Sequence, residues 1–459
     1  MGVVNLRPFL FSRMRMNNKN MKILVIGNGF DLAHYLPTSY NHFMGVMAAI
    51  EKLPKQIDSD LFDGVLFGDL FGELIKQEKQ EDKKDWYFFD RMKQLYTVEN
   101  MKFDRQVVDS FKRMLNENTW YAYFRQHLAE IETWIDFETK IGEALEVFDS
   151  VNGKFYEKKI ERGSDFEPLN HHTSTKSYIY LGDKHTRCSK VFGILKEDIA
   201  DEESYSSRFS DRYLDSRYKE LKFDLVLADI QSSLSQFAII FDLYLSIIIS
   251  AFIPRRTFID PDKTFQGQKL LYSFNYTQTF KKLYTGYQAD IGVEYLHGEA
   301  GNKDKKLVLG VSKLSTDGLK KHKAYGFVKY HQKLFNNTDY QFLKENRAVQ
   351  EVIKTFNPNS SLSESVNITI WGHSLDISDE DYIKEIFSFN DSNAPRGCVV
   401  VTILFHSDSS RFSILANLLH ILEKEVVELW MKKKWLQFKL APDIYELNRL
   451  DSPTALEHV

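Results

Sequence analysis

Asn275 and His297 are the two side chains of this sequence that we expect to take part in catalysis. Asn275 ends the apolar segment LLYSFN, and its amide offers both a donor and an acceptor, so it can orient a water molecule or a sugar hydroxyl. His297 ends the segment VEYLH, and an ordinary pKa near neutrality suits it to accept a proton from a hydroxyl nucleophile. Each also has a structural interpretation, Asn275 as a helix cap and His297 as a histidine satisfied inside the fold.

A glycine-bearing turn near the N-terminus predicts a nucleotide site. The stretch Met21–Asp31, MKILVIGNGFD, passes from an apolar run through Gly27 and Gly29 into a helical pattern. Because glycine lets the backbone approach a ligand and a helix start presents N–H groups, a pyrophosphate would be held here. Leu32 stands where the dinucleotide fingerprint has a third glycine, and Asp31 suits a ribose hydroxyl better than a phosphate. The alternative is an ordinary strand-to-helix connection.

A second turn of this kind occupies Ile370–Asp376, IWGHSLD, and is followed by a helical pattern. Ser374, Asp376 and Asp379 can cap helices or hold a ribose. The run SDEDYIKEIF has the composition of a first helical turn, which favours capping for Ser378 and Asp379.

The segment WIDFE at 134–138 carries two more carboxylates. Asp136 and Glu138 are two residues apart and cannot share one face of a helix, so they do not form an acid–base pair. A helix start with Asp136 as its cap is the interpretation we favour.

Apolar runs predict the strands that position these residues, at 22–27, 269–275, 292–297, 306–311, 366–371 and 397–405. Val, Ile and Leu dominate them, as in strands that are buried on both faces of a parallel sheet. Since ligands of such sheets bind at the carboxyl ends of the strands, the candidate residues above fall where a ligand is expected. The sequence therefore predicts an α/β fold with a Rossmann-like parallel sheet and a large helical insertion.

The domain organisation follows from the same pattern. We expect an N-terminal extension at 1–20, a nucleotide-binding core from 21–44 and 266–440, a helical insertion or lid at 45–265, and a C-terminal tail at 441–459. Within these parts, 150–210 reads as loops or a lid over a pocket, 320–356 as a further helical insertion, and 408–440 as closing helices. Translation starting at Met21 is the simpler interpretation of the N-terminus.

Composition excludes several classes of protein. The 459-residue chain has a net charge of −4 and only two cysteines, Cys188 and Cys398, so it builds neither a disulfide framework nor a four-cysteine zinc cluster. We expect a cytoplasmic protein. The longest apolar run, Phe237–Phe252, is interrupted by Asp242 and is shorter than a membrane span, which predicts a buried helix and no transmembrane segment. Its aromatic residues fit either the core or a homo-oligomer interface.

Metal and nucleic-acid sites are poorly supported. One group of potential ligands matches no zinc spacing, and we expect no metal: His171, His172, His185 and Cys188. The basic and aromatic stretch 320–331 resembles a strand-binding surface, but the net acidic charge favours a solvated helix face and argues against a nucleic-acid partner.

Six segments in combination resemble the AbiH family, bacterial proteins associated with abortive infection by phage. They are ILVIGNGFDLAHYLPTSYNHF near the start, WIDFE at 134–138, SFNYTQTFKKLY at 273–284, LHG at 296–298, LVLGV at 307–311 and IWGHSLDISDEDY at 370–382. The one departure is Tyr35, where the family more usually has glycine. The resemblance implies a role in phage defence.

The same order of motifs is similar, more loosely, to the sirtuin-like domains of bacterial defence proteins that destroy NAD. This resemblance implies that NAD is the ligand, that Asn275 lies near the nicotinamide ribose and that His297 is the general base. It implies the following nucleotide-lining residues: Gly27, Asn28, Gly29, Phe30, Asp31, Tyr276 and Thr277, with Gly372, His373, Ser374 and Asp376 at the adenosine end. Deacetylation is not implied, because this chain cannot build the zinc module of such deacetylases.

Cleavage of the nicotinamide–ribose bond is the reaction that this second resemblance implies. A rival hypothesis is a nucleotide-binding sensor or scaffold without turnover, which would use the same turn. A nucleic-acid-directed toxin ranks behind both. A phage-derived trigger and self-association are further partners that the sequence leaves open.

Overall fold

The computed structural model describes residues 20–54, 64–80, 87–131, 133–161, 178–196, 206–215, 220–287, 291–336 and 342–450. One six-stranded sheet organises the fold, and all of its neighbouring strands are parallel. Its strands are β1 (Asn20–Ile26), β8 (Gln268–Ser273), β9 (Gly292–Tyr295), β10 (Ser365–Trp371), β11 (Val399–Phe405) and β12 (Leu436–Leu440).

The strand order is β12-β11-β10-β1-β8-β9, which, counted along the chain within this sheet, is 6-5-4-1-2-3. This is the order of the doubly wound Rossmann fold, in which ligands bind where the order reverses, between the first and fourth strands. Here the reversal lies between β1 and β10, whose registers run from Asn20–Ser365 to Ile26–Trp371. The predicted parallel α/β core is confirmed.

Two expectations about strands were wrong. Residues 306–310 form no strand, although they are apolar; Val311 makes a single bridge to Val328, and Leu307 and Leu309 pack into the main hydrophobic core. The apolar run is therefore buried by neighbouring helices instead of by strand pairing. The segment 408–440 is not helical throughout, since its last five residues form the edge strand β12, with the alternating pattern LQFKL.

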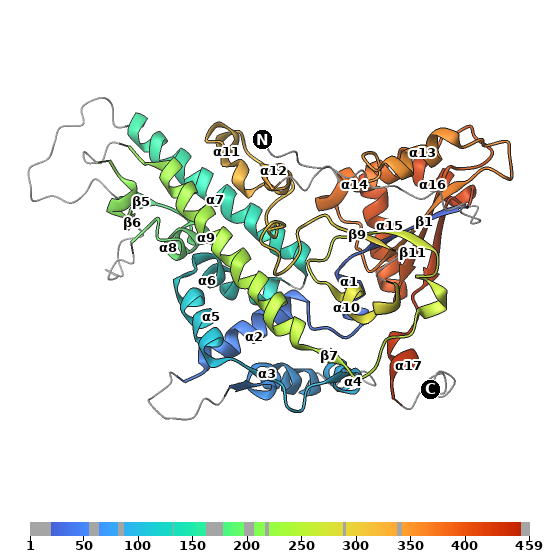
Figure 1. The fold of residues 1–459 in the computed structure, drawn as a ribbon. Helices are drawn as coiled ribbons and strands as arrows, with labels where there is room; N and C mark the ends of the chain where they lie inside the picture. The colour runs from blue at the N-terminus through green and yellow to red at the C-terminus, as the bar shows by residue number, and fades with distance from the viewer. Residues whose placement is uncertain are drawn as a thin grey trace, which may run out of the picture.

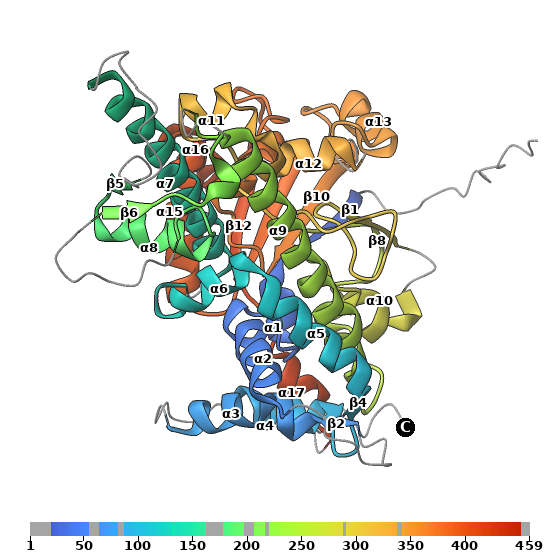
Figure 2. The same ribbon diagram turned by 90° about the vertical axis from the view of Figure 1, so that its left-hand side faces the viewer.

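A large set of helices lies between β1 and β8 in the chain and beside the sheet in space (Figures 1 and 2). They are α1 (Asn28–Ala33), α2 (Tyr40–Lys52), α3 (Phe67–Gln80), α4 (Phe88–Leu95), α5 (Arg105–Glu117), α6 (Thr119–Gln126), α7 (Trp134–Glu161), α8 (Asp183–Val191) and α9 (Phe223–Leu243). Three short antiparallel pairs accompany them: β2 (Val65–Leu66) with β4 (Lys102–Phe103), β3 (Tyr96–Thr97) with β7 (Ile253–Pro254), and β5 (Tyr178–Tyr180) with β6 (Ser206–Arg208).

The region 150–210 was expected to be loops or a lid, but α7 extends to Glu161 and α8 fills Asp183–Val191. The rest of this region, apart from the β5–β6 pair and short connections, lies outside the described residues, as do His171, His172 and residues 1–19. His185 and the buried Cys188 lie in α8.

Further helices follow β8 in the chain. They are α10 (Thr279–Leu283), α11 (Asp317–Lys321), α12 (Lys329–Phe335), α13 (Arg347–Thr355), α14 (Glu380–Phe387), α15 (Asp408–Ile421), α16 (Lys424–Lys432) and α17 (Ile444–Asn448). The last of these lies beside α4 in both views, where Tyr445 Oη donates to Gln94 Oε1 at 2.6 Å (Figures 1 and 2).

The apolar helix α9 continues through a π-helical turn, η4 (Tyr244–Ile248), and a short 3-10 turn, η5 (Ile249–Ala251). Within the described residues, Phe223–Ala251 is long and apolar enough, by length and composition, to cross a membrane. In this fold Phe237, Phe241 and Tyr244 are buried against Phe43. The prediction of a buried helix is confirmed, and these rings belong to the core of the chain.

Candidate functional site

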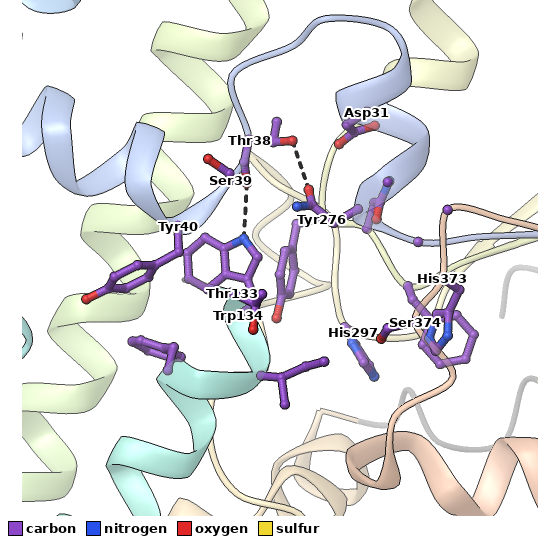
Figure 3. Close-up of a pocket in the computed structure, with 18 of the residues that line it drawn as sticks. Asp31, Thr38, Ser39, Tyr40, Thr133, Trp134, Tyr276, His297, His373 and Ser374 are labelled. Carbon is purple, nitrogen blue, oxygen red and sulfur yellow. Dashed lines mark hydrogen bonds between the residues drawn. The ribbon is translucent and has the colours of Figure 1, made fainter. Parts of the chain in front are cut away.

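One cavity of about 270 Å³ lies at the carboxyl ends of β1, β8 and β10, next to the turn that follows β9. The insertion closes it with residues from α7 and α9 (Figure 3). It is lined by Gly27, Asn28, Gly29, Asp31, Leu32, Thr38, Ser39, Tyr40, Thr133, Trp134, Ile135, Phe137, Glu138, Phe241, Leu245, Phe274, Asn275, Tyr276, Thr277, His297, Leu309, Lys329, Gly372, His373, Ser374, Ser378 and Asp379. Segments that are far apart in the chain thus meet at one site.

All predicted site residues line this cavity except Phe30 and Asp376. Phe30 is fully buried, with its ring 5.0 Å from that of Trp371, so it belongs to the core beneath the turn. Asp376 accepts a hydrogen bond from the N–H of Ser378 at 3.0 Å and thereby caps the 3-10 helix η9 (Ile377–Asp379). Neither side chain faces a ligand in this arrangement.

The glycines of the first turn serve close backbone packing. The N–H of Gly27 donates to Trp371 O at 3.1 Å, and that of Gly29 donates to Gly372 O at 2.8 Å. A Cβ on Gly29 would lie 2.8 Å from Gly372 Cα, and Gly372 itself has φ +70°. The expectation that this turn offers these N–H groups to a pyrophosphate was wrong, because Trp371, the last residue of β10, and Gly372, which follows it, already accept them.

Asp31 forms a polar corner below this turn. Thr277 Oγ1 donates to its Oδ2 at 2.6 Å, and Thr279 Oγ1 donates to Thr277 Oγ1 at 3.0 Å. Burial raises the pKa of Asp31 to about 6, while hydrogen bonds from Thr277, Thr279 and Asn275 act in the opposite direction. The other oxygen, Oδ1, is buried with no hydrogen-bond partner of good geometry among the described residues.

Asn275 is held where β8 ends. Its backbone N–H donates to Ser273 Oγ at 3.1 Å, and that hydroxyl donates to Asn275 O at 2.9 Å. The helix α10 begins at Thr279 after Gln278, so Asn275 does not cap it, and the capping interpretation was wrong. The residue is 4% exposed, and its Nδ2 has no well-aligned partner within the described chain.

Asp379 lies between the two histidines of the site. Its Oδ1 is 3.1 Å from His297 Nε2, without the alignment of a hydrogen bond, and its Oδ2 is 3.3 Å from His373 Nε2. The N–H of Leu375 donates to His373 Nδ1 at 2.9 Å, which places the proton of a neutral His373 on Nε2, facing the carboxylate. The two histidines therefore lie close together, one against each oxygen of the same carboxylate.

The charges of this group are set by burial and by two lysines. Burial and the positive charge of Lys333 lower the pKa of His297 to about 3 in spite of Asp379, so its imidazole is neutral at physiological pH. Burial opposes the charge of Asp379, but His297, the Lys329 ammonium and the contact with His373 hold its pKa well below the usual range. The charged carboxylate of Asp379 thus lies next to the neutral imidazole of His297.

The sequence offered Asp379 as a helix cap or a ribose contact and favoured the cap. Asp379 is the N-cap residue of α14, as its context suggested, but its side chain makes no capping hydrogen bond and turns into the cavity wall. Nothing in the run SDED distinguishes it from the acidic residues around it, all of which suit a first helical turn.

Glu138 and Lys329 form a buried ion pair that the sequence did not reveal. The expectation that Asp136 caps α7 was wrong, because the helix begins at Trp134 and Asp136 lies in its first turn, where it accepts from the N–H of Thr133 at 2.8 Å. Glu138 lines the cavity. Burial raises the pKa of Glu138 to about 7 against the effect of Lys329. Burial also disfavours the charge of Lys329, but Glu138 and Asp379 hold its pKa above the usual value. Lys329 is only 4% exposed, so the expected solvated face was wrong for this residue, and Lys333, just beyond that stretch, is equally buried.

Four aromatic residues line the cavity, Tyr40, Trp134, Phe241 and Tyr276, and we call them the aromatic wall; Trp134 and Tyr276 lie beside His297 in Figure 3. Trp134 Nε1 donates to Thr38 O at 3.0 Å, and its ring centre lies 4.5 Å from that of Phe241. Tyr276 Oη donates to Val308 O at 3.0 Å, which fixes the buried LVLGV segment beside the site. The cavity thus has one aromatic side and one charged side.

No group of three or more His, Cys, Asp or Glu side chains within the described ranges is arranged to hold a metal ion. Cys188 is also poorly suited to bind a metal ion, because burial raises the pKa of its thiol to about 12 and so keeps the thiol protonated.

Comparison with known proteins gives one match. The family model described as bacteriophage abortive infection AbiH matches residues 23–400 of the 459-residue chain, which include every residue that lines the cavity. No curated protein and no solved structure matches the chain. The chain therefore belongs to the AbiH family of bacteriophage abortive infection proteins.

Proposed function

We propose that this protein acts in abortive phage defence by binding a ribosyl nucleotide, with NAD as the first candidate, and hydrolysing its nicotinamide–ribose bond. The main observation behind the proposal is that several buried polar atoms without a well-aligned hydrogen-bond partner among the described residues lie around the same cavity. Six buried side-chain atoms without a well-aligned partner belong to residues that line this one cavity: Asp31 Oδ1, Tyr40 Oη, Glu138 Oε2, Asn275 Nδ2, His297 Nε2 and Asp379 Oδ1. Because such atoms are costly to bury, a polar ligand that pairs with them explains why they occur together.

A sugar is the ligand part that this set of atoms suits. Ribose hydroxyls both donate and accept, so they can pair with the oxygens of Asp31 and Glu138 and with the amide of Asn275. The site also lies at the reversal of strand order, where sheets of this topology bind their ligands.

The reaction has few requirements. The C1′–N bond breaks with its electron pair going to nicotinamide, which leaves as a neutral molecule, and positive charge builds on the ribose. Water attacks C1′; Asn275 orients it, and His297 takes up its proton. The carboxylate of Asp379, 3.1 Å from His297 Nε2, stabilises the imidazolium that forms. General base catalysis of this kind contributes roughly 10²–10⁴-fold to the rate.

The resemblance to sirtuin-like domains remains a prediction within this proposal. Its assignment of His297 and Asn275 to the ribose end is kept. Its assignment of Gly372, His373 and Ser374 to a distant adenosine end is not, because His373 contacts the same carboxylate as His297. We place the activity in the cytoplasm of the host cell, where the phage replicates.

A second candidate, a nucleotide sensor without turnover, rests on the low pKa of His297, which makes it a weak base. Incubating the purified protein with NAD, alone and with lysate of phage-infected cells, and measuring nicotinamide by chromatography separates the two. We expect release by the wild type and loss of it, together with toxicity, in Asn275→Ala and His297→Ala. Nicotinamide release retained by either variant contradicts the assigned roles, whereas saturable NAD binding without any release favours the sensor.

A further inference from the structure

Carboxyl groups outnumber basic side chains in the lining of the cavity. Three carboxyl groups line it, those of Asp31, Glu138 and Asp379, and they come from three separate elements. Among the described side chains that line the cavity, Lys329 is the one lysine or arginine, and its ammonium is already paired with Glu138. Lys333 does not line the cavity and donates to Tyr382 Oη at 3.0 Å, but its ammonium adds a second positive charge near His297, so basic groups still number fewer than the carboxyl groups.

Each of the three carboxyl groups keeps one buried oxygen without a well-aligned partner in the described chain. Asn275 independently keeps Nδ2 unpaired at a residue exposure of 4%. An acid-lined cavity of this kind repels a phosphate, since like charges at short range are costly where water is excluded. The two glycine N–H groups that commonly bind phosphate are also occupied by Trp371 O and Gly372 O.

The aromatic residues of the cavity add to the preference for positive charge. The rings of Trp134 and Tyr276 line it, and aromatic rings attract cations to their faces. A flat cationic ring can lie against this wall while the sugar attached to it reaches the carboxyl groups. The two sides therefore favour the same kind of ligand.

We propose that the cavity selects a cationic N-ribosyl group, such as a pyridinium riboside, and leaves any phosphate of the ligand outside. This inference rests on the proposed function and names the part of the nucleotide that enters the site. It also changes the expected orientation of the ligand, because the first glycine turn then packs against the turn after β10 and does not hold the pyrophosphate.

Charge selection can be measured without catalysis. Carbocyclic nicotinamide riboside, whose C–N bond does not hydrolyse, carries a positive ring, and its 1,4-dihydro form has nearly the same shape and no charge. Calorimetric titration of the full chain should show at least tenfold tighter binding of the cation, about 1.4 kcal/mol. Adding a 5′-phosphate to the cation should improve binding by less than threefold.

Variants test whether the carboxyl groups cause the preference. In Glu138→Gln and in Asp379→Asn, each checked for folding by circular dichroism, the ratio of the two dissociation constants should fall to less than threefold. Asp317→Asn, whose carboxylate is 99% exposed on α11, should keep the wild-type ratio. If one variant does not fold, the other is compared with the wild type. The ratio of the two dissociation constants for the wild type tests charge selection without either variant.

Three results overturn the inference: equal binding of the charged and neutral ribosides, a tenfold or larger gain from the 5′-phosphate, or no binding of either riboside at millimolar concentration. These results are separate from the fate of the proposed function. Charge selection without nicotinamide release from NAD refutes hydrolysis alone, and hydrolysis without charge selection refutes this inference alone.

Discussion

Oδ1 of Asp379 lies 3.1 Å from Nε2 of His297, and the second oxygen of the same carboxylate lies 3.3 Å from Nε2 of His373. One buried anion therefore joins the turn after β9 to the turn after β10. The β8 and β1 ends complete the ring of strand ends around the cavity. This relationship makes Asp379 the residue through which the two histidine motifs act together.

Asp379→Asn should lower the rate of nicotinamide release by about 10²-fold or more, because the neutral amide no longer stabilises an imidazolium on His297. We expect most of the loss in kcat and little in KM, measured by initial rates of NAD consumption. Asp317→Asn serves as the control, since its side chain is exposed and remote from the site. An Asp379→Asn protein with wild-type kcat would remove the carboxylate from the mechanism.

Gly372→Ala should destabilise the fold by about 3 kcal/mol or more, because φ at this position is +70° and the new Cβ would lie 2.1 Å from the N of Phe30. The matched control is Gly72→Ala in α3, where nothing lies within 4 Å of the added Cβ. There we expect a gain of up to about 1 kcal/mol from helix propensity. Urea denaturation of both variants measures the difference, and equal midpoints would contradict the close packing of the two turns.

Asp31→Asn should stabilise the protein, and more at pH 8 than at pH 4. The folded pKa of Asp31 is about 6 and its ordinary value is 3.8, so between these values the folded state binds more protons than the unfolded state. Stability contributed by this group is therefore present below pH 4 and is lost as the pH rises through 6, by up to about 3 kcal/mol.

The amide in Asp31→Asn removes that loss. Thermal melts of wild type and variant at a series of pH values test it, with the exposed Asp317→Asn as the control. A difference in stability that does not change between pH 4 and pH 8 contradicts the burial of an ionisable Asp31.

Lys329→Met should destabilise the protein by about 3–5 kcal/mol, because it leaves the carboxylate of Glu138 buried without its cation. The double variant Lys329→Met/Glu138→Gln should recover at least half of that loss, since the unpaired charge is removed as well. Chemical denaturation of the two single variants and the double variant gives the coupling energy. Additive effects would show that the ion pair does not join α7 to α12.

The parallel core could be predicted from the sequence because its signals are local. The run MKILVI, the glycine turn and the segment ending in Asn275 each specify a strand or its end within a few residues, and the rule that parallel sheets bind at their carboxyl ends then brings the motifs together. The family assignment rests on the same segments. Strand β12 was missed because its five residues follow a helical pattern and occupy a sheet edge, where burial is slight.

Three charged members of the site, Asp379, Glu138 and Lys329, were decided by tertiary structure, whereas Asp31 was predicted from the sequence. Asp379 sits in a run that suits any helix start, Glu138 sits on an amphipathic helix, and Lys329 lies in a lysine-rich stretch. The local sequence around each of these residues is equally typical of a side chain that is exposed to solvent. All three are buried because α7, α12 and the turn after β10 pack against one another around the cavity. Packing between segments that are distant in the chain cannot be inferred from the residues next to Asp379, Glu138 or Lys329 in the sequence.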